Sequence, residues 1–179
     1  MDNQQIILDS FFSTGLGRVN DPEIFKIVEP IIEKQKYKTD SISEYCLIAE
    51  ENDELIDALE ETADMLYEKY LSIIFKKNEL IYTSLWKGVD KDAMVWHNDY
   101  CEGADLAFLC YFHTLNEHTG GSLQLHDLEK PDDIITVIPK KYDVVLFNQH
   151  LRWEHRVTPL IEIPTDRTVM NFGFQTENY

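Results

Sequence analysis

The 179-residue chain has few cysteines, a shortage of basic residues and no long apolar run, and each shortage excludes a class of protein. Its three cysteines, Cys46, Cys101 and Cys110, are odd in number and match no zinc-finger spacing, so we expect reduced thiols in a cytoplasmic protein. No stretch approaches the roughly 18 uninterrupted apolar residues of a membrane span. The first dozen residues also lack the basic start and the apolar run of a signal peptide. The sequence therefore predicts no membrane partner.

Basic residues are outnumbered by acidic ones, 16 Lys and Arg against 33 Asp and Glu, which gives a formal net charge of −17. A chain of this charge repels phosphate groups, so we expect no nucleic-acid partner and no docking on anionic lipid. The 44% hydrophobic and 12% aromatic content is normal for a folded protein. The length fits one domain, residues 1–179, while the oligomeric state is left open.

The first 78 residues are expected to be mainly helical. Residues 6–8 are predicted to form a short strand, and Asp21 followed by Pro22 is typical of a helix start. Pro30 is expected to kink or split that helix. The clearest helix is predicted over residues 52–76, where an apolar stripe recurs at helical spacing. Its acidic residues lie in the first half, which suits the helix dipole and indicates a solvated face rather than a metal site.

The pattern after Asn78 changes to short apolar or alternating runs separated by turn residues. The predicted strands are residues 80–86, 94–100, 106–112, 122–126, 134–138, 144–147, 155–160 and 168–174. Many short strands at regular spacing favour a barrel or sandwich. We therefore predict a mainly β fold with flanking α-helices. A jelly roll, or double-stranded β-helix, over about 79–179 would pack against a helical part over about 1–78.

His97 and Asp99 are the first residues with a chemical pattern, because side chains two apart on a strand point to the same face. An imidazole and a carboxylate so placed supply two ligands of the 2-His-1-carboxylate triad that holds non-haem Fe(II). The third ligand must come from a distant strand. His155 begins an apolar strand and is favoured over His150, which lies in a polar run.

Arg167 follows His155 by 12 residues, at the start of the last predicted strand. One hairpin between them would place Arg167 beside the strand of His155 and deeper in the barrel. An arginine inside a barrel is costly unless it has a fixed anionic partner. A bound dicarboxylate would supply that partner through a bidentate contact.

These elements occur in the chain in the order His97-x-Asp99, Gly120–Leu123, Val145–Phe147, His155–Pro159 and Arg167. In this order the chain resembles the Fe(II)/2-oxoglutarate-dependent oxygenases, and most of all their prolyl-4-hydroxylase-like branch. Residues 6–12 are also similar to the N-terminal strand of that branch. The resemblance implies Fe(II) as the metal, 2-oxoglutarate and O2 as cosubstrates, and ascorbate as a supporting reductant.

The resemblance also implies roles for single residues. Three would bind Fe(II) and carry catalysis: His97, Asp99 and His155. Arg167 would bind the distal carboxylate of 2-oxoglutarate, and Tyr111 would help to hold it. Phe112 or His113 would take the place of Tyr111 if the register shifts, and Tyr82 is a further cosubstrate contact.

The function implied is hydroxylation of an unidentified substrate, with a prolyl residue of a peptide or protein as the expectation from the branch. The alternative within the family is a hydroxylase of free amino acids or other small molecules. Outside it, a cupin-like protein that binds metal or ligand without redox chemistry and a zinc hydrolase stay open. Four aromatic residues near the metal strands are expected to line a substrate groove: Trp86, Trp96, Tyr100 and Trp153.

Overall fold

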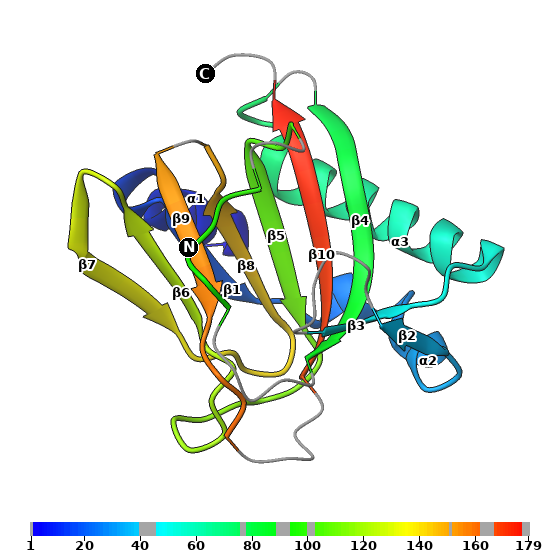
Figure 1. Cartoon of the computed structure of the whole chain (residues 1–179). Coiled ribbons are helices and arrows are strands. Elements are labelled where there is room, and N and C mark those ends of the chain that lie inside the picture. Colours follow the sequence, from blue (N-terminus) through cyan, green and yellow to red (C-terminus); the bar gives the residue numbers. More distant parts are fainter. Residues whose placement is uncertain are drawn as a thin grey trace.

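The computed structural model describes residues 2–39, 46–75, 78–88, 94–99, 103–150, 152–161 and 167–176. These residues form two antiparallel sheets with helices on one side (Figure 1). The larger sheet has the spatial order β1 (Leu16–Asn20), β8 (Asp143–Asn148), β5 (Leu106–Tyr111), β10 (Arg167–Thr176), β4 (Asn78–Gly88), β3 (Cys46–Ala49) and β2 (Tyr37–Thr39). The smaller sheet has the order β7 (Lys130–Val137), β6 (Leu123–Asp127) and β9 (Trp153–Val157). The predicted mainly β fold with flanking helices is confirmed.

The central strands of the larger sheet are buried on both faces, and β5 shows how each face is used. Leu106, Phe108 and Cys110 pack into a core cluster together with the two longer helices. The alternate residues Ala107, Leu109 and Tyr111 pack into a second cluster with residues of β6 and β7 in the smaller sheet. The alternation follows from the two-residue repeat of a strand. The space between the sheets is therefore lined by one set of alternate side chains.

Helix α1 (Asn3–Thr14) packs against the larger sheet in the first core cluster. The prediction of a strand over residues 6–8 is therefore wrong. The Asp2 side chain caps the helix by accepting a hydrogen bond from the Gln5 backbone N–H at 2.9 Å. Gly15 ends it in the left-handed conformation, with its N–H bonded to the Phe11 carbonyl. Ile7 and Phe11 lie four residues apart and are buried together, which is a helical spacing rather than a strand repeat.

Two short helices follow β1. The 3-10 helix η1 (Pro22–Phe25) begins after Asp21, whose carboxylate accepts a hydrogen bond from the Glu23 backbone N–H, as the sequence predicts for a capping residue. Helix α2 (Glu29–Ile32) carries Pro30 in its first turn, so the chain breaks before the proline and starts again there. None of the helices in the described residues is long and apolar enough to cross a membrane.

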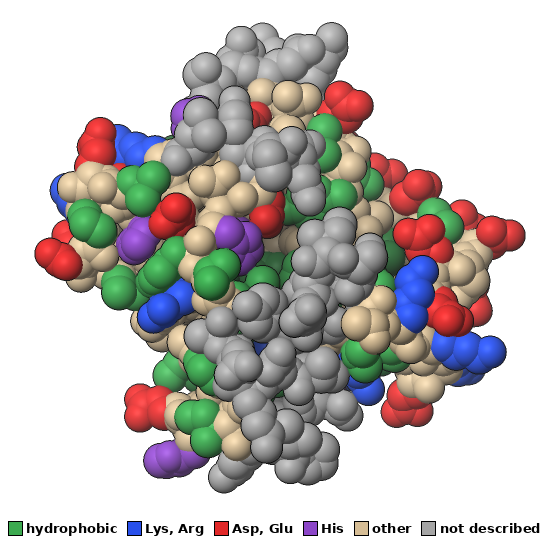
Figure 2. Space-filling model, viewed as in Figure 1, with side chains coloured by type: hydrophobic (Ala, Val, Ile, Leu, Met, Phe, Trp, Pro, Cys, Tyr) green, Lys and Arg blue, Asp and Glu red, His purple; other side chains and the backbone are tan. Residues whose placement is uncertain are grey.

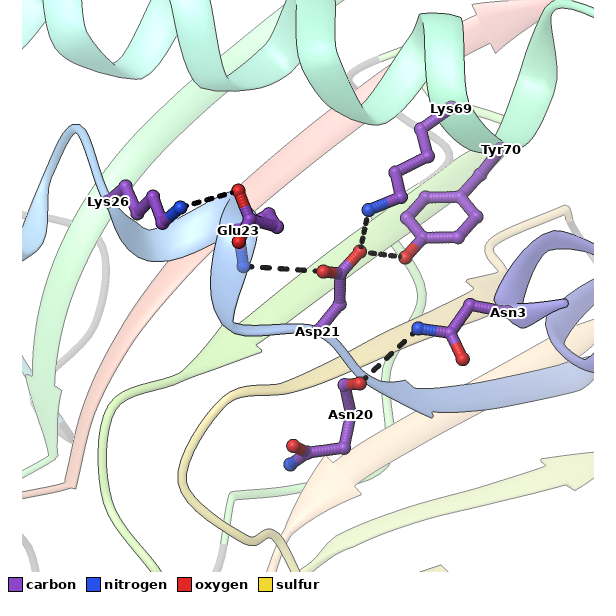
Figure 3. Close-up of polar contacts among 7 residues, drawn as sticks. All are labelled: Asn3, Asn20, Asp21, Glu23, Lys26, Lys69 and Tyr70. Carbon is purple, nitrogen blue, oxygen red and sulfur yellow. Dashed lines mark hydrogen bonds and ion pairs between the residues drawn. The ribbon is translucent and has the colours of Figure 1, made fainter.

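Helix α3 (Asp53–Leu66) continues as the π-helix η2 (Tyr67–Leu71), and together they lie within the predicted helix. Figure 3 shows how this end is fixed to the junction of β1 and η1. Lys69 Nζ lies 2.5 Å from a carboxylate oxygen of buried Asp21, and the Tyr70 hydroxyl donates a hydrogen bond to the same oxygen. Burial raises the pKa of Asp21, but these two hydrogen bonds, the charge of Lys69 and the Glu23 backbone hydrogen bond together leave the pKa below its ordinary 3.8.

Seven of the predicted strands are confirmed as β4 to β10, with ends that shift by a few residues. The predicted strand over 94–100 is wrong, because residues 94–99 form only an isolated bridge and Tyr100 lies outside the described residues. The short strands β1, β2 and β3 of the N-terminal part were not predicted.

Candidate active site

His97 and Asp99 lie on the irregular segment 94–99, which runs beside β9 at the open edge of the smaller sheet. His97 and His155 exchange backbone hydrogen bonds of 3.1 and 2.8 Å, and the Met94 N–H bonds to the Val157 carbonyl. A directly opposed pair brings its side chains together, and the two imidazole centroids are 4.3 Å apart. The isolated bridge between His97 and His155 therefore places the two imidazoles together, although residues 94–99 do not form the regular strand that was predicted.

The side chains of His97, Asp99 and His155 form one cluster, with ligand atoms within 4.8 Å of one another. His97 Nε2 lies 3.7 Å from Asp99 Oδ1, and His155 Nε2 lies 3.6 Å from Asp99 Oδ2. His150 is exposed and lies elsewhere, on a shallow pocket with Asp105 and Trp153. Among the described residues the structure thus groups His155, not His150, with the His-x-Asp pair.

The two imidazoles have different surroundings: His97 is fixed by a hydrogen bond, and His155 is buried. His97 Nδ1 lies 2.9 Å from the Val95 carbonyl, which can only accept, so Nδ1 is the donor of this hydrogen bond and Nε2 faces Asp99. His155 is 7% exposed, and burial, with a smaller effect of His97, lowers its pKa to about 3. Its imidazole is therefore neutral at pH 7, while its Nδ1 has no hydrogen-bond partner among the described residues.

Asp99 is the acidic member of the cluster. Burial raises the pKa of its carboxyl group, and the neighbouring His97 and a hydrogen bond from Gln149 oppose that rise. Gln149 Nε2 donates to Asp99 Oδ2 at 2.9 Å. The carboxyl group is thus held by an amide at Oδ2, with one imidazole near each of its oxygens.

The cluster opens into a narrow pocket between the two sheets. Its wall is mainly apolar: Trp86, Met94, Leu109, Leu123, Phe147, Val157 and Val169. Two further polar residues of β10 line it, Arg167 and Asn171, and the Asn171 side-chain oxygen has no hydrogen-bond partner within the described residues. An apolar pocket with a few convergent polar groups is the usual form of a small-molecule site.

Arg167 is 5% exposed, and no described carboxylate forms an ion pair with it. Its Nε donates to the Gly121 carbonyl at 3.1 Å, and its guanidinium carbon lies 5.6 Å from the Tyr111 ring centre. Burial raises the pKa of Tyr111, which Arg167 partly opposes, and the Tyr111 hydroxyl makes no hydrogen bond among the described residues. A buried cation beside an unpaired hydroxyl is suited to an anion that accepts from both.

Of the remaining predicted site residues that the structure describes, only Trp86 lines this pocket. Tyr82 of β4 donates its hydroxyl hydrogen bond to the Gln149 side-chain oxygen at 3.0 Å and does not line the pocket wall. Of the four expected groove aromatics, Trp86 lines the pocket. Trp96 stacks on His126 at 4.1 Å, Trp153 lines the shallow pocket, and Tyr100 lies outside the described residues.

Gln149 and Asn171 were not singled out in the sequence. Gln149 belongs to the polar run that follows the apolar strand β8, and it is completely buried. Asn171 interrupts the apolar residues of β10. A polar residue directly after or within a buried strand is the signal that could have identified both, since buried polar groups need partners.

The sequence matches a known protein family over the region that carries this site. The family model described as the 2OG-Fe(II) oxygenase superfamily matches residues 84–175, slightly more than half of the chain. This region contains all four of His97, Asp99, His155 and Arg167. No curated protein sequence gives a significant match.

Solved structures share the fold at low sequence identity. A 2OG-Fe(II) oxygenase family oxidoreductase from Burkholderia pseudomallei matches with a TM-score of 0.75 at 9% identity, covering 99% of this chain and 92% of that chain. A prolyl hydroxylase from Trichoplax adhaerens, in complex with a peptide fragment of the hypoxia inducible factor oxygen degradation domain, matches at 0.68 and 14%, covering 97% and 89%. HygX from Streptomyces hygroscopicus, with nickel, 2-oxoglutarate and hygromycin B bound, matches at 0.69 and 12%, covering 97% and 87%. These likenesses confirm the jelly-roll fold.

Proposed function

The chain belongs to the 2OG-Fe(II) oxygenase superfamily, and from this premise we propose that it is an Fe(II)- and 2-oxoglutarate-dependent hydroxylase. The observation that carries the proposal is one pocket that holds two histidines, one aspartate and a buried arginine with no carboxylate partner among the described residues. Residues 1–179 are proposed to act as one domain, because β1 of the N-terminal part pairs with β8 of the same sheet. A cytoplasmic location is also proposed, since Cys110 is a free buried thiol.

The metal site is proposed to consist of His97, Asp99 and His155. Two imidazoles and one carboxylate are the donor set of the facial triad for non-haem Fe(II), which leaves positions open for other ligands. The donor atoms lie within 4.8 Å of one another, and the low pKa of His155 means that no proton competes for its lone pair at pH 7. The residues present therefore fit the metal.

The cosubstrate site is proposed to lie between Arg167 and the metal ligands, in the same pocket. Arg167 would pair with the distal carboxylate of 2-oxoglutarate, and Tyr111 would donate its free hydroxyl to it. Iron and 2-oxoglutarate supply the oxidising chemistry when bound, with O2 as the second cosubstrate and ascorbate as a supporting reductant. The chain's residues fix both groups, and the apolar wall excludes water.

The substrate is proposed to be a prolyl residue in a peptide or protein. The Trichoplax adhaerens prolyl hydroxylase was solved in complex with a peptide fragment, so a similar fold accommodates a peptide in that protein. HygX is bound to hygromycin B, so a small-molecule substrate is the second candidate. A prolyl segment is preorganised and loses little entropy on binding beside an aromatic wall such as Trp86.

The metal and cosubstrate sites are tested together by calorimetry and turnover. We expect His97→Ala and His155→Ala to lose Mn(II) binding and Fe(II)-dependent conversion of 2-oxoglutarate to succinate. His150→Ala is the matched control and should retain both. Arg167→Ala should bind Mn(II) normally but lose about 2–5 kcal/mol of 2-oxoglutarate affinity, because a charge-assisted pair is removed.

Three outcomes would contradict this assignment. Unchanged turnover in His97→Ala would show that the proposed metal site is wrong. Loss of metal binding in His150→Ala alone would identify His150, instead of His155, as the third ligand. Tight Zn(II) binding without any 2-oxoglutarate binding would favour a zinc hydrolase or a cupin-like binding protein. For the substrate, mass spectrometry of prolyl peptides after incubation should show the gain of one oxygen. Oxidation of free amino acids or other small molecules alone would favour the second candidate.

A further inference from the structure

Gln149 connects the proposed metal site to a second strand through two hydrogen bonds. Its side-chain nitrogen donates to Asp99 Oδ2 at 2.9 Å, and its side-chain oxygen accepts from the Tyr82 hydroxyl at 3.0 Å. Gln149 is fully buried, and its backbone N–H is bonded to the Asp105 carbonyl at 2.9 Å. Tyr82, Gln149 and Asp99 thus form one continuous hydrogen-bonded row, which we name the amide relay.

The chemistry of the three groups fixes the direction of the amide relay. An ionised carboxylate only accepts hydrogen bonds, so Asp99 requires the nitrogen end of the Gln149 amide. The oxygen end then faces away, toward a group that must donate, and the phenol of Tyr82 is such a group. If the hydroxyl were absent, the amide would lose the partner that holds its oxygen end. Reversing the amide would then turn oxygen toward the Asp99 carboxylate, which is repulsive.

The fold makes room for Tyr82 to take this position. Tyr82 of β4 is paired with Gly173 of β10, and a side-chain carbon built on Gly173 would lie 2.2 Å from the Tyr82 ring. Any side chain at position 173 would displace the ring. The absence of a side chain on Gly173 therefore allows the phenol to lie across β10 and reach Gln149.

We propose that Gln149 is a positioning residue of the metal site, and that Tyr82 acts through it to hold the Asp99 carboxylate in the orientation that ligates the metal. The inference rests on the proposed function and adds two residues to it. It also gives Tyr82 a role behind Asp99 instead of a contact with 2-oxoglutarate. The row uses Asp99 Oδ2, so Oδ1 is left without a hydrogen bond among the described residues, 3.7 Å from His97 Nε2.

Mn(II) affinity of the full chain without 2-oxoglutarate is the measurement that tests the amide relay. We expect Gln149→Met, which keeps the length of the side chain but removes its donor, to weaken Mn(II) binding by about 10- to 100-fold. Tyr82→Phe removes only the hydroxyl and should weaken it by about threefold to tenfold. The electron paramagnetic resonance spectrum of bound Mn(II) should change in both variants, because the carboxylate ligand is less well oriented.

A tyrosine outside the site provides the matched control. Tyr142 donates its hydroxyl to Glu29 in a part-buried hydrogen bond, so Tyr142→Phe removes the same group without touching the metal site and should bind Mn(II) like the wild type. Circular dichroism and thermal unfolding of the metal-free proteins establish that each variant is folded. If Gln149→Met does not fold, Tyr82→Phe alone decides the outcome.

Each result separates the amide relay from its rivals. Wild-type Mn(II) affinity in folded Tyr82→Phe and Gln149→Met, with His97→Ala unable to bind, would overturn the amide relay and leave the proposed function intact. Unchanged Mn(II) affinity with weakened 2-oxoglutarate binding in Tyr82→Phe would also overturn it and assign Tyr82 to the cosubstrate. Absence of Mn(II) binding in the wild type would overturn both the proposed function and the amide relay.

Discussion

At the scale of single residues, Gly121 shows how a turn position supports the cation of the site. Gly120 and Gly121 both have positive φ angles, 70° and 73°, which glycine adopts without a steric cost. Gly121 does more than turn the chain. The Gly121 carbonyl accepts the hydrogen bond of Arg167 Nε, and a side-chain carbon on Gly121 would lie 3.1 Å from Arg167 Cδ. The missing side chain therefore leaves space for the arginine.

We predict that Gly121→Ala weakens 2-oxoglutarate binding to the Mn(II)-loaded protein as well as lowering stability. The added methyl group would crowd Arg167 and also Leu160, at 2.8 Å, while the positive φ costs about 1–3 kcal/mol for a non-glycine residue. Gly103→Ala is the matched control, since its φ is 91° and no atom lies within 4 Å of the added carbon. Both variants should lose stability, but only Gly121→Ala should lose cosubstrate affinity by calorimetry. Equal 2-oxoglutarate affinities of the two variants would show that Gly121 does not support cosubstrate binding.

The proposed ligands could be identified from the sequence, whereas their supports could not. His97 and Asp99 stand out because they lie two residues apart in an expected strand, and His155 because it begins an apolar run within an order of motifs that resembles the family. Gln149 acts only because Tyr82, 67 residues earlier, is brought beside it by the fold. A contact of this kind leaves no local pattern, so it becomes visible only in three dimensions.

At the scale of elements, sequence reasoning succeeded where a two-residue or 3.6-residue repeat extends over several turns or strand positions. The buried strands β5 and β8 and the helix α3 are examples. It failed where tertiary contacts decide the structure. Segment 94–99 is held by its bridge to β9 and not by its own pattern, and α1 is set by two capping residues around a short apolar stripe. The three-residue strand β2 is too short to show a repeat.

Asp21 is the residue through which η1 and η2 are joined, and its depressed pKa predicts how that joint responds to acid. The ionised form is favoured in the folded state, so its contribution is fully present above the ordinary pKa of 3.8 and is lost as the pH falls through the lower folded value. We predict that Asp21→Asn costs about 2 kcal/mol of unfolding free energy at pH 6, because a hydrogen-bonded buried charge is removed.

Urea unfolding of wild type and Asp21→Asn at pH 6 and near pH 3 measures this difference, which should shrink at the lower pH. Glu23→Gln is the control, since Glu23 pairs with Lys26 on the exposed side of η1 (Figure 3) and should change the unfolding free energy by less than about 0.5 kcal/mol. A difference that stays constant between the two pH values would show that the Asp21 charge does not stabilise the joint.

At the scale of the whole molecule, the formal charge of −17 is distributed unevenly. Acidic side chains gather over α3, on the side away from the smaller sheet (Figure 2). The amphipathic pattern of α3 required this, because one face packs on the sheet and the other must carry the polar residues. The acidic residues predicted to form a solvated face thus lie on a helix whose opposite face packs into the core. The proposed metal ligands lie on a different part of the chain, between the sheets.

Repulsion among these charges predicts a stability that increases with salt. Surface charges interact over a Debye length of about 30 Å at 0.01 M salt but only about 10 Å at 0.1 M, so added NaCl removes the long-range repulsion first. Partly buried pairs such as Lys69 with Asp21 are screened less, and their attraction is retained. We expect the melting temperature at pH 7.5 to increase between 10 and 200 mM NaCl, by about 2–4 °C for each kcal/mol of repulsion relieved.

The same salt titration at pH 5, near the sequence pI of 4.6, is the control. The melting temperature should increase less there, because the net negative charge of the protein is smaller. A melting temperature that falls with salt at pH 7.5 would mean that ion pairs, rather than repulsion, dominate the electrostatic free energy of this fold.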